Sequence, residues 1–127
     1  TANISGGIVV TLPQQVSLED ASRGLAMLKQ LDIPVLGVIE NMSYLELPDG
    51  SIVDVFGSGG GEKLASQAGV PFLGSIPLDT EVRVGGDEGK PIVISNPKAP
   101  AAVAMDSITE QMAAGLSVLA MEADQVG

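Results

Sequence analysis

Two short apolar runs joined by a helical stretch constrain the fold of this chain more than any other feature. The first run extends from Ile8 to Leu12 and the second covers residues 35–39; both are rich in β-branched residues and uncharged, which is typical of buried strands. Between them, apolar residues recur at helical spacing over about residues 18–31, with Ser17 as the expected N-cap. Strand, helix and strand with short connections predict a βαβ unit with parallel strands and a right-handed crossover.

The rest of the chain continues the alternation of strands and helices. Pro48-Asp49-Gly50 is a turn signal between two short apolar stretches and predicts a hairpin over residues 45–53. No repeat or linker divides the chain, so we expect one α/β domain over 1–127, frayed at 122–127. Further elements are expected as follows: a helix over 62–68 ended by Gly69, a strand over 71–77, a helical turn over 80–84, a loop over 85–91, a strand over 92–94 and a helix over about 101–121.

Composition excludes several classes of function. Sixteen acidic residues against six Lys and Arg give a formal charge of −10, which argues against a nucleic acid or an anionic membrane as partner. No apolar run approaches the roughly 20 residues of a membrane span, and the first residues do not resemble a signal peptide, so we expect a cytoplasmic protein. With neither cysteine nor histidine, disulfides, thiolate ligands and the usual general base are absent.

A polar cluster and a glycine-rich loop are the candidate binding features. The residues from Glu40 to Tyr44 follow the second strand, and open α/β sheets bind ligands at such carboxyl ends. The loop at 57–61 invites a phosphate-binding interpretation, but Glu62 separates Gly61 from Lys63, and an anion would be repelled there. We therefore expect a flexible connection rather than a Walker A loop.

The acidic residues suggest two weaker alternatives. Asp87 and Glu88 are either paired acids or part of a solvated turn, and the turn is the more frequent case for neighbouring surface acids. Glu46, Asp49 and Asp54 lack the spacing of an EF-hand. Chemistry alone therefore leads only to an acidic α/β domain with a polar cluster at a strand end.

Five segments of the sequence resemble the Mrp/ApbC family of iron–sulfur carrier ATPases. They are GIVVTLPQQVSLEDASRGLAM at 7–27, IPVLGVIENMS at 33–43, FGSGGGEKLA at 56–65, VPFLGSIPLD at 70–79 and GKPIV at 89–93. They occur in the family's order, and the resemblance runs from about residue 7 to residue 114. It implies the C-terminal part of a MinD-like P-loop NTPase fold, with a partial doubly wound, mostly parallel sheet and flanking helices.

The resemblance also implies an ATP site. Asn41 corresponds to the side chain that reads the adenine, since an amide offers both a donor and an acceptor. Ile76, Pro77, Leu78 and Asp79 correspond to the wall around the base. The alternative for Asn41 is a turn residue that bonds only to its own backbone.

Two departures from the family pattern limit what the resemblance implies. The family's deviant Walker A and its Asp-Pro-Pro-Gly segment precede the first strand seen here, so we expect no ATP hydrolysis by this polypeptide alone. Many relatives carry Cys-x-x-Cys shortly after NMSY, and here Leu47 stands about where the first cysteine would be. We therefore expect no iron–sulfur cluster bound through cysteine.

Three functions and two partners remain open at this point. The first function is that of a nucleotide-binding relative of the carrier ATPases, and the second is a non-catalytic oligomerising module that kept the fold and lost the ligand. The third is a small-molecule binder that uses the region of Asn41 and Pro77. Without the P-loop strand beside it, the strand from Ile8 to Leu12 becomes an apolar sheet edge. We expect this edge to form a homodimer or to meet a P-loop-bearing partner chain.

Overall fold

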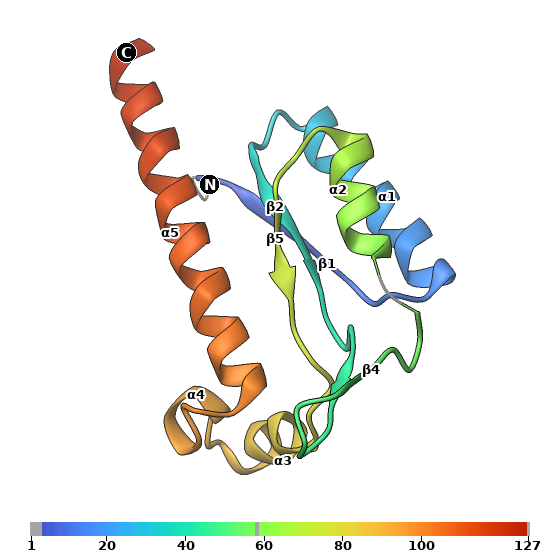
Figure 1. Ribbon diagram of the computed structural model, residues 1–127. Coiled ribbons are helices and arrows are strands. Elements are labelled where there is room, and N and C mark those ends of the chain that lie inside the picture. Colours follow the sequence, from blue (N-terminus) through green and yellow to red (C-terminus); the bar gives the residue numbers. More distant parts are fainter. Residues whose placement is uncertain (1–3, 58, 127) are drawn as a thin grey trace.

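A parallel sheet between two layers of helices forms the centre of the protein (Figure 1). The computed structural model describes residues 4–57 and 59–126. The sheet has the strand order β1-β2-β5, with α1 and α2 on one face and α5 on the other. The predicted α/β class with flanking helices is confirmed. The bounds are β1 Gly7–Thr11, α1 Gln15–Gln30, β2 Val35–Glu40, α2 Gly60–Ala68, β5 Phe72–Ser75 and α5 Pro100–Val126.

The core is aliphatic and is split by the sheet. On one face Val9 and Val38 pack with Ala21 and Leu25 of α1 and with Ala65 of α2. On the other face a second cluster joins the sheet to α5; it consists of Ile39, Leu73 and Ile108. Because successive residues of a strand point to opposite faces, the strands need apolar residues throughout, as the two apolar runs indicated.

The start of α1 differs from the prediction. The helix begins at Gln15 with Gln14 as its N-cap, so Ser17 lies inside the first turn. The Ser17 hydroxyl oxygen instead accepts a hydrogen bond from the Leu12 N–H at 2.9 Å. Ser17 therefore fixes the connection between β1 and α1 rather than capping the helix.

The segment after β5 was predicted least well. A loop was expected over 85–91, but α3 (Thr80–Glu88) continues through Gly85 and Gly86. A strand was expected over 92–94, and this prediction is wrong, because α4 (Ile92–Ser95) is a short helix. The physical reason is tertiary: Ile92 is buried against Ala99, Ala101 and Ala102, which a helical turn permits. At the chain's end α5 continues to Val126 where fraying was expected, and residue 127 lies outside the described residues.

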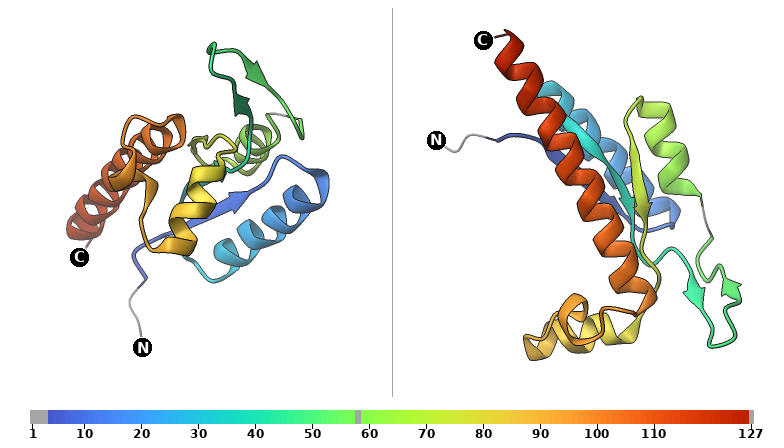
Figure 2. Two further views of the ribbon diagram at one scale, coloured as in Figure 1. Left: turned by 90° about the horizontal axis from the view of Figure 1, so that it is seen from below. Right: turned by 60° about the vertical axis from the view of Figure 1, so that its left-hand side comes forward.

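The predicted hairpin is confirmed and projects from the rest of the molecule. It consists of β3 (Leu45–Glu46) and β4 (Ile52–Val53), which pair antiparallel with Leu45 opposite Val53. Figure 2 shows it extending beyond the sheet between the end of β2 and the start of α2. The helix α2 ends, as predicted, at Gly69, which has a left-handed conformation with φ 71°.

The first strand lies at an edge of the sheet. Within the described ranges, β1 pairs with β2 on one side, and no strand pairs with β1 on the other side. Helix α5 covers β2 and β5, so the side chains of Ile8 and Val10 on that face remain 36% and 55% exposed. In the same part of the chain, no helix is both long enough and apolar enough to span a membrane.

Candidate functional site

The turn after β2 is held between its two neighbouring strands. The Asn41 N–H donates to the Thr11 carbonyl oxygen at 2.8 Å, at the end of β1. On the other side, the Ile76 N–H donates to the Glu40 carbonyl oxygen at 2.8 Å and the Ser43 N–H donates to the Ile76 carbonyl oxygen at 3.0 Å. Hydrogen bonds of this kind leave the backbone of the turn little freedom, so its side chains have defined directions.

The side chain of Asn41 is partly used within its own turn. Its Oδ1 accepts a hydrogen bond from the Met42 N–H at 2.9 Å. Since a backbone N–H needs an acceptor, this bond fixes which end of the amide is oxygen and leaves the NH2 group as the end that can reach a ligand. Asn41 therefore offers a ligand a donor.

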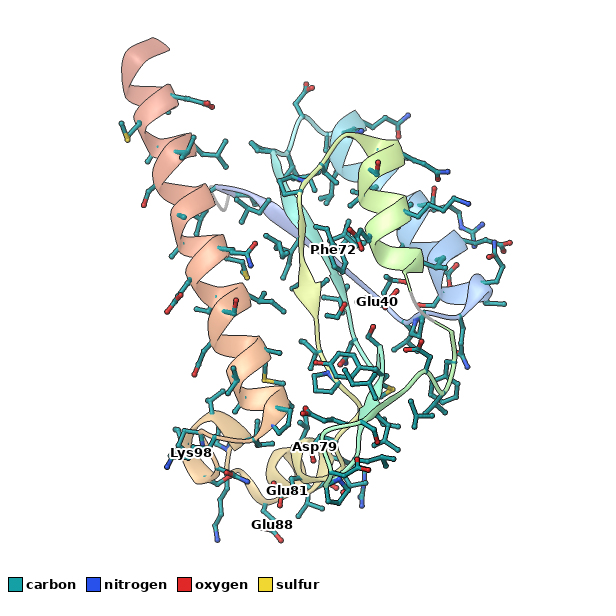
Figure 3. All side chains as sticks on the ribbon, viewed as in Figure 1. Glu40, Phe72, Asp79, Glu81, Glu88 and Lys98 are labelled. Atoms are coloured by element: carbon teal, nitrogen blue, oxygen red, sulfur yellow. The ribbon has the colours of Figure 1, made fainter. Side chains whose placement is uncertain are left out.

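A cavity of about 360 Å³ opens beside this turn. Of the five residues predicted for the base site, Asn41, Pro77, Leu78 and Asp79 line it. The fifth, Ile76, packs instead against the two clusters around Ile92 and Ile39, and its backbone holds the turn. The complete lining is Asn41, Met42, Pro77, Leu78, Asp79, Thr80, Val82 and Arg83. Figure 3 labels Asp79 where the chain enters α3.

Asp79 both caps a helix and lines the cavity. It is the N-cap of α3, and its Oδ1 accepts a hydrogen bond from the Glu81 N–H at 2.9 Å. Its Oδ2 stays available as an acceptor. The cavity thus combines apolar walls with a donor from Asn41 and an acceptor from Asp79, an arrangement typical of small-molecule sites.

Arg83 brings the one cation among the lining residues. Its Nη1 lies 3.4 Å from the Asp87 Oδ2, with both side chains about 73% exposed. Exposed pairs of this kind contribute little to stability, on the order of 0.5 kcal/mol, so the guanidinium can exchange Asp87 for a ligand. Asp87 is thus solvent-exposed, as the second of the two sequence interpretations expected, but it lies in the helix α3 and not in a turn.

Four lining residues were missed by sequence reasoning. Met42 follows Asn41 directly, and Thr80 follows Asp79. Val82 and Arg83 stand three and four positions after Asp79, which is the helical spacing that puts side chains on one face. That spacing was the available signal, because a helical turn was expected from Thr80 onward.

The glycine-rich segment is engaged with the protein itself. The Gly61 N–H, in the first turn of α2, donates to the Glu40 Oε1 at 2.8 Å. A Cβ on Gly60 would lie 2.6 Å from the Leu18 Cδ1, so this glycine lets α2 approach α1 closely. Close packing explains these glycines without a phosphate. In the residues that the structure describes, no group of three or more His, Cys, Asp or Glu could hold a metal ion.

Tyr44 lies next to the turn and stays neutral over a wide pH range. Its partial burial raises the pKa of the phenol, and the negative charge of Glu46 raises it further. A neutral phenol keeps both a donor and an acceptor. The Tyr44 carbonyl oxygen accepts from the Leu78 N–H at 2.7 Å, which ties the base of the hairpin to the wall of the cavity.

A parallel β1-β2-β5 sheet with a cavity at its carboxyl ends is typical of the open α/β proteins that bind ligands at this edge of the sheet. Among solved structures, the cell division ATPase MinD of Pyrococcus furiosus is similar, with a TM-score of 0.67 and 25% identity over 85% of this chain and 42% of that one. MinD of Pyrococcus horikoshii, solved with Mg-ADP, has a TM-score of 0.67 and 27% identity over 84% of this chain and 40% of that one.

Sequence comparison identifies the family. The family model described as "ParA: NUBPL iron-transfer P-loop NTPase" matches residues 1–113, and the chain belongs to this family. The iron–sulfur cluster carrier protein of Synechocystis is 48% identical over 121 residues, which are 93% of this chain and 34% of the relative. The chain thus spans about a third of the length of that relative. The resemblance found in the sequence is confirmed.

Proposed function

We propose that this chain provides the base-binding end of an ATP site in an iron–sulfur carrier NTPase, and that it does not hydrolyse ATP by itself. The observation that carries the proposal is the cavity that brings the Asn41 NH2 group and the Asp79 carboxylate together. Family membership supports it, as does the Mg-ADP in the structure of MinD from Pyrococcus horikoshii.

The donor set of the cavity fits a purine base. An exocyclic amino group would donate to the Asp79 carboxylate, and a ring nitrogen would accept from the Asn41 NH2. Met42, Pro77 and Leu78 would contact the faces of the ring through apolar atoms. Within residues 4–57 and 59–126, no matching set of groups for the phosphates is found in the glycine-rich segment, since the Gly61 N–H is bonded to Glu40. A P-loop would therefore have to come from another part of the complete assembly.

The iron–sulfur part of the function needs a second contributor. The sequence has no cysteine, so a cluster carried by the assembly would be held by thiolates that lie outside these 127 residues. We further propose a cytoplasmic location. Fractionation of cells that express the protein would test the location.

Calorimetric titration of the chain with Mg-ATP tests the base site. We expect Asn41→Ala to weaken binding by about tenfold, because one hydrogen bond to the base is lost. No heat at millimolar nucleotide would contradict the proposal. Unchanged affinity in Asn41→Ala would show that the nucleotide binds elsewhere.

Substitutions of Asp79 separate its two tasks. Asp79→Asn keeps an oxygen that can accept from the Glu81 N–H, so we expect unchanged thermal stability but at least about tenfold weaker binding of Mg-ATP. Asp79→Ala removes the cap as well and is expected to lower the free energy of unfolding by about 1 kcal/mol. If both variants bound the nucleotide like the native chain, Asp79 would be a cap only.

A second candidate function is a non-catalytic oligomerising module. The exposed face of β1, where Val10 is 55% exposed, favours it. The partner would be a second copy of this chain or a P-loop-bearing chain. Self-association combined with no nucleotide binding would support this function over the first.

A further inference from the structure

Glu40 is a buried carboxylate at the end of an otherwise apolar strand. Its side chain belongs to a residue only 1% exposed, and the rest of β2 reads Val-Leu-Gly-Val-Ile. Removing a carboxylate from water is costly, and an apolar residue of similar volume would stabilise the core better. The presence of Glu40 therefore calls for an explanation other than packing.

Each oxygen of this carboxylate has its own hydrogen-bond partner. The two partners lie at opposite ends of the segment that connects β2 to α2. Oε2 accepts a short hydrogen bond from the Ser43 hydroxyl, just after β2. Oε1 accepts from the Gly61 N–H at 2.8 Å, at the start of α2. The β3–β4 hairpin lies between these two points, so one side chain holds both ends of the segment that carries the hairpin. Figure 3 labels Glu40 near the start of α2.

Glu40 also replaces a cap that α2 lacks. The N-cap residue of α2 is Gly59, which has no side chain to offer its first N–H groups. A carboxylate near a helix N-terminus is favoured by the helix dipole, and Glu40 provides it from a neighbouring strand. Space for it depends on Gly61, since a Cβ there would lie 3.0 Å from the Glu40 Cβ and 3.3 Å from the Phe72 Cε1.

The turn that Glu40 closes contains a strained residue. Met42 has φ 52°, a left-handed conformation that is unfavourable for a residue with a side chain. Such conformations persist where surrounding bonds enforce them. The bond from Ser43 to Glu40 and the bond from the Met42 N–H to Asn41 both enforce this one. The direction of the Asn41 amide thus depends on Glu40.

We propose that Glu40 is a positioning residue that holds the Asn41 turn, the hairpin and the start of α2 as one unit. A ligand in the cavity and the order of the hairpin are then linked, although Glu40 does not line the cavity. The link to the ligand rests on the proposed base site. The role of Glu40 in holding the unit is independent of that site, because it depends only on the hydrogen bonds to Ser43 and Gly61.

Hydrogen–deuterium exchange of two variants tests the proposal. Glu40→Met has similar length but no acceptor, and we expect the amides of residues 42–62 to exchange about tenfold faster, with α5 unchanged. Glu40→Gln keeps an oxygen for the Gly61 N–H and is expected to restore exchange to within about threefold of the native chain. Glu110→Gln, at an exposed position in the interior of α5, is the control and is expected to leave the exchange of residues 42–62 unchanged.

The same experiment with saturating Mg-ATP tests the link to the cavity. In the native chain we expect slower exchange at 77–83 and also at 45–56; in Glu40→Met only the first segment is expected to slow. Native exchange rates at 42–62 in ligand-free Glu40→Met would overturn the proposal. Nucleotide binding that leaves 45–56 of the native chain unchanged would overturn the link and leave the base site intact.

Two further outcomes remain decisive. If Mg-ATP does not bind, the proposed base site fails, and the ligand-free comparison of the variants still decides the role of Glu40. If Glu40→Met does not fold, Ser43→Ala removes one bond and keeps the carboxylate on Gly61. We then expect about threefold faster exchange confined to residues 43–47, and native rates there would overturn the proposal.

Discussion

Two residues other than glycine adopt positive φ angles in the described parts of the chain, and they do so for different reasons. Met42 lies in the turn of the candidate site, with φ 52°. Asp32, with φ 56°, follows the C-cap Leu31 of α1 and turns the chain toward β2. The first conformation serves the direction of Asn41, whereas the second only ends a helix. A glycine should therefore be tolerated at the second position.

Replacement of Asp32 by glycine is expected to stabilise the protein. Glycine adopts the left-handed conformation without the steric cost, and the change removes a negative charge from the C-terminal end of α1. We expect the free energy of unfolding to rise by about 1 kcal/mol, measured by urea denaturation. Asp106→Gly, inside α5, is the control and should lower it by a similar amount; a loss of stability in Asp32→Gly would contradict the argument.

At the scale of elements, α3 shows how a helix can depend on the space around it. Gly85 and Gly86 are adjacent in the same helix, but a Cβ on Gly85 would lie 2.4 Å from the Lys90 carbonyl oxygen. A Cβ on Gly86 would have no atom within 4 Å. Gly85 is required because the chain after α3 passes close to it at Lys90, whereas nothing requires a glycine at position 86.

The two glycines make a matched pair of substitutions. Gly85→Ala is expected to lower the free energy of unfolding by about 1–3 kcal/mol, because a backbone atom has to move. Gly86→Ala is expected to raise it by about 0.5–1 kcal/mol, since alanine loses less entropy in a helix. Thermal unfolding of both variants checks the pair. Equal effects would mean that the contact with Lys90 does not matter.

The turn of the β3–β4 hairpin is expected to respond to pH. The Ser51 hydroxyl and N–H donate to the Asp49 Oδ1 at 2.6 and 2.9 Å and hold the pKa of that carboxyl below its ordinary value. A lowered pKa means that the ionised form stabilises the folded turn above the ordinary value of 3.8, and that this contribution is lost as the pH falls through the lowered pKa.

An NMR titration of the Ser51 amide from pH 6 to pH 2 would follow this change. We expect the amide shift to move at a pH below the ordinary value of about 4 for aspartate. In Asp49→Asn the side chain keeps an oxygen but cannot be protonated in this range, so the shift should stay constant. A midpoint above the ordinary aspartate value would contradict the hydrogen-bond explanation.

At the scale of the whole molecule, the open edge of the sheet predicts association. We expect sedimentation velocity to show a dimer at high protein concentration, formed through β1 and the exposed face of Ile8 and Val10. Val10→Lys should weaken the dimer by at least about tenfold, because a buried charge opposes association. Ile94→Lys, at an exposed position of α4, is the control. A monomer at every concentration would favour a different chain as the partner.

Most elements of the fold could be predicted because their signals are local. The runs that became β1 and β2, the helical spacing of α1 and the turn at Pro48-Asp49-Gly50 depend on residues close together in the chain. Two of the failures, α4 and the second half of α3, lie where distant contacts override local preference. The Ile92 side chain, for example, is buried by residues at the start of α5.

By itself, the sequence determined the alternation of strands and helices, the family and half of the residues around the cavity, because hydrophobic periodicity and motif spacing depend on residues close together in the chain. Only the tertiary structure decided which atoms of Asn41 and Asp79 remain for a ligand, since that depends on the bonds they make to Met42 and Glu81. It also decided the role of Glu40, whose partner Gly61 lies 21 positions away. A contact of that separation has no local signature, and it exists because the parallel sheet brings the end of β2 beside the start of α2.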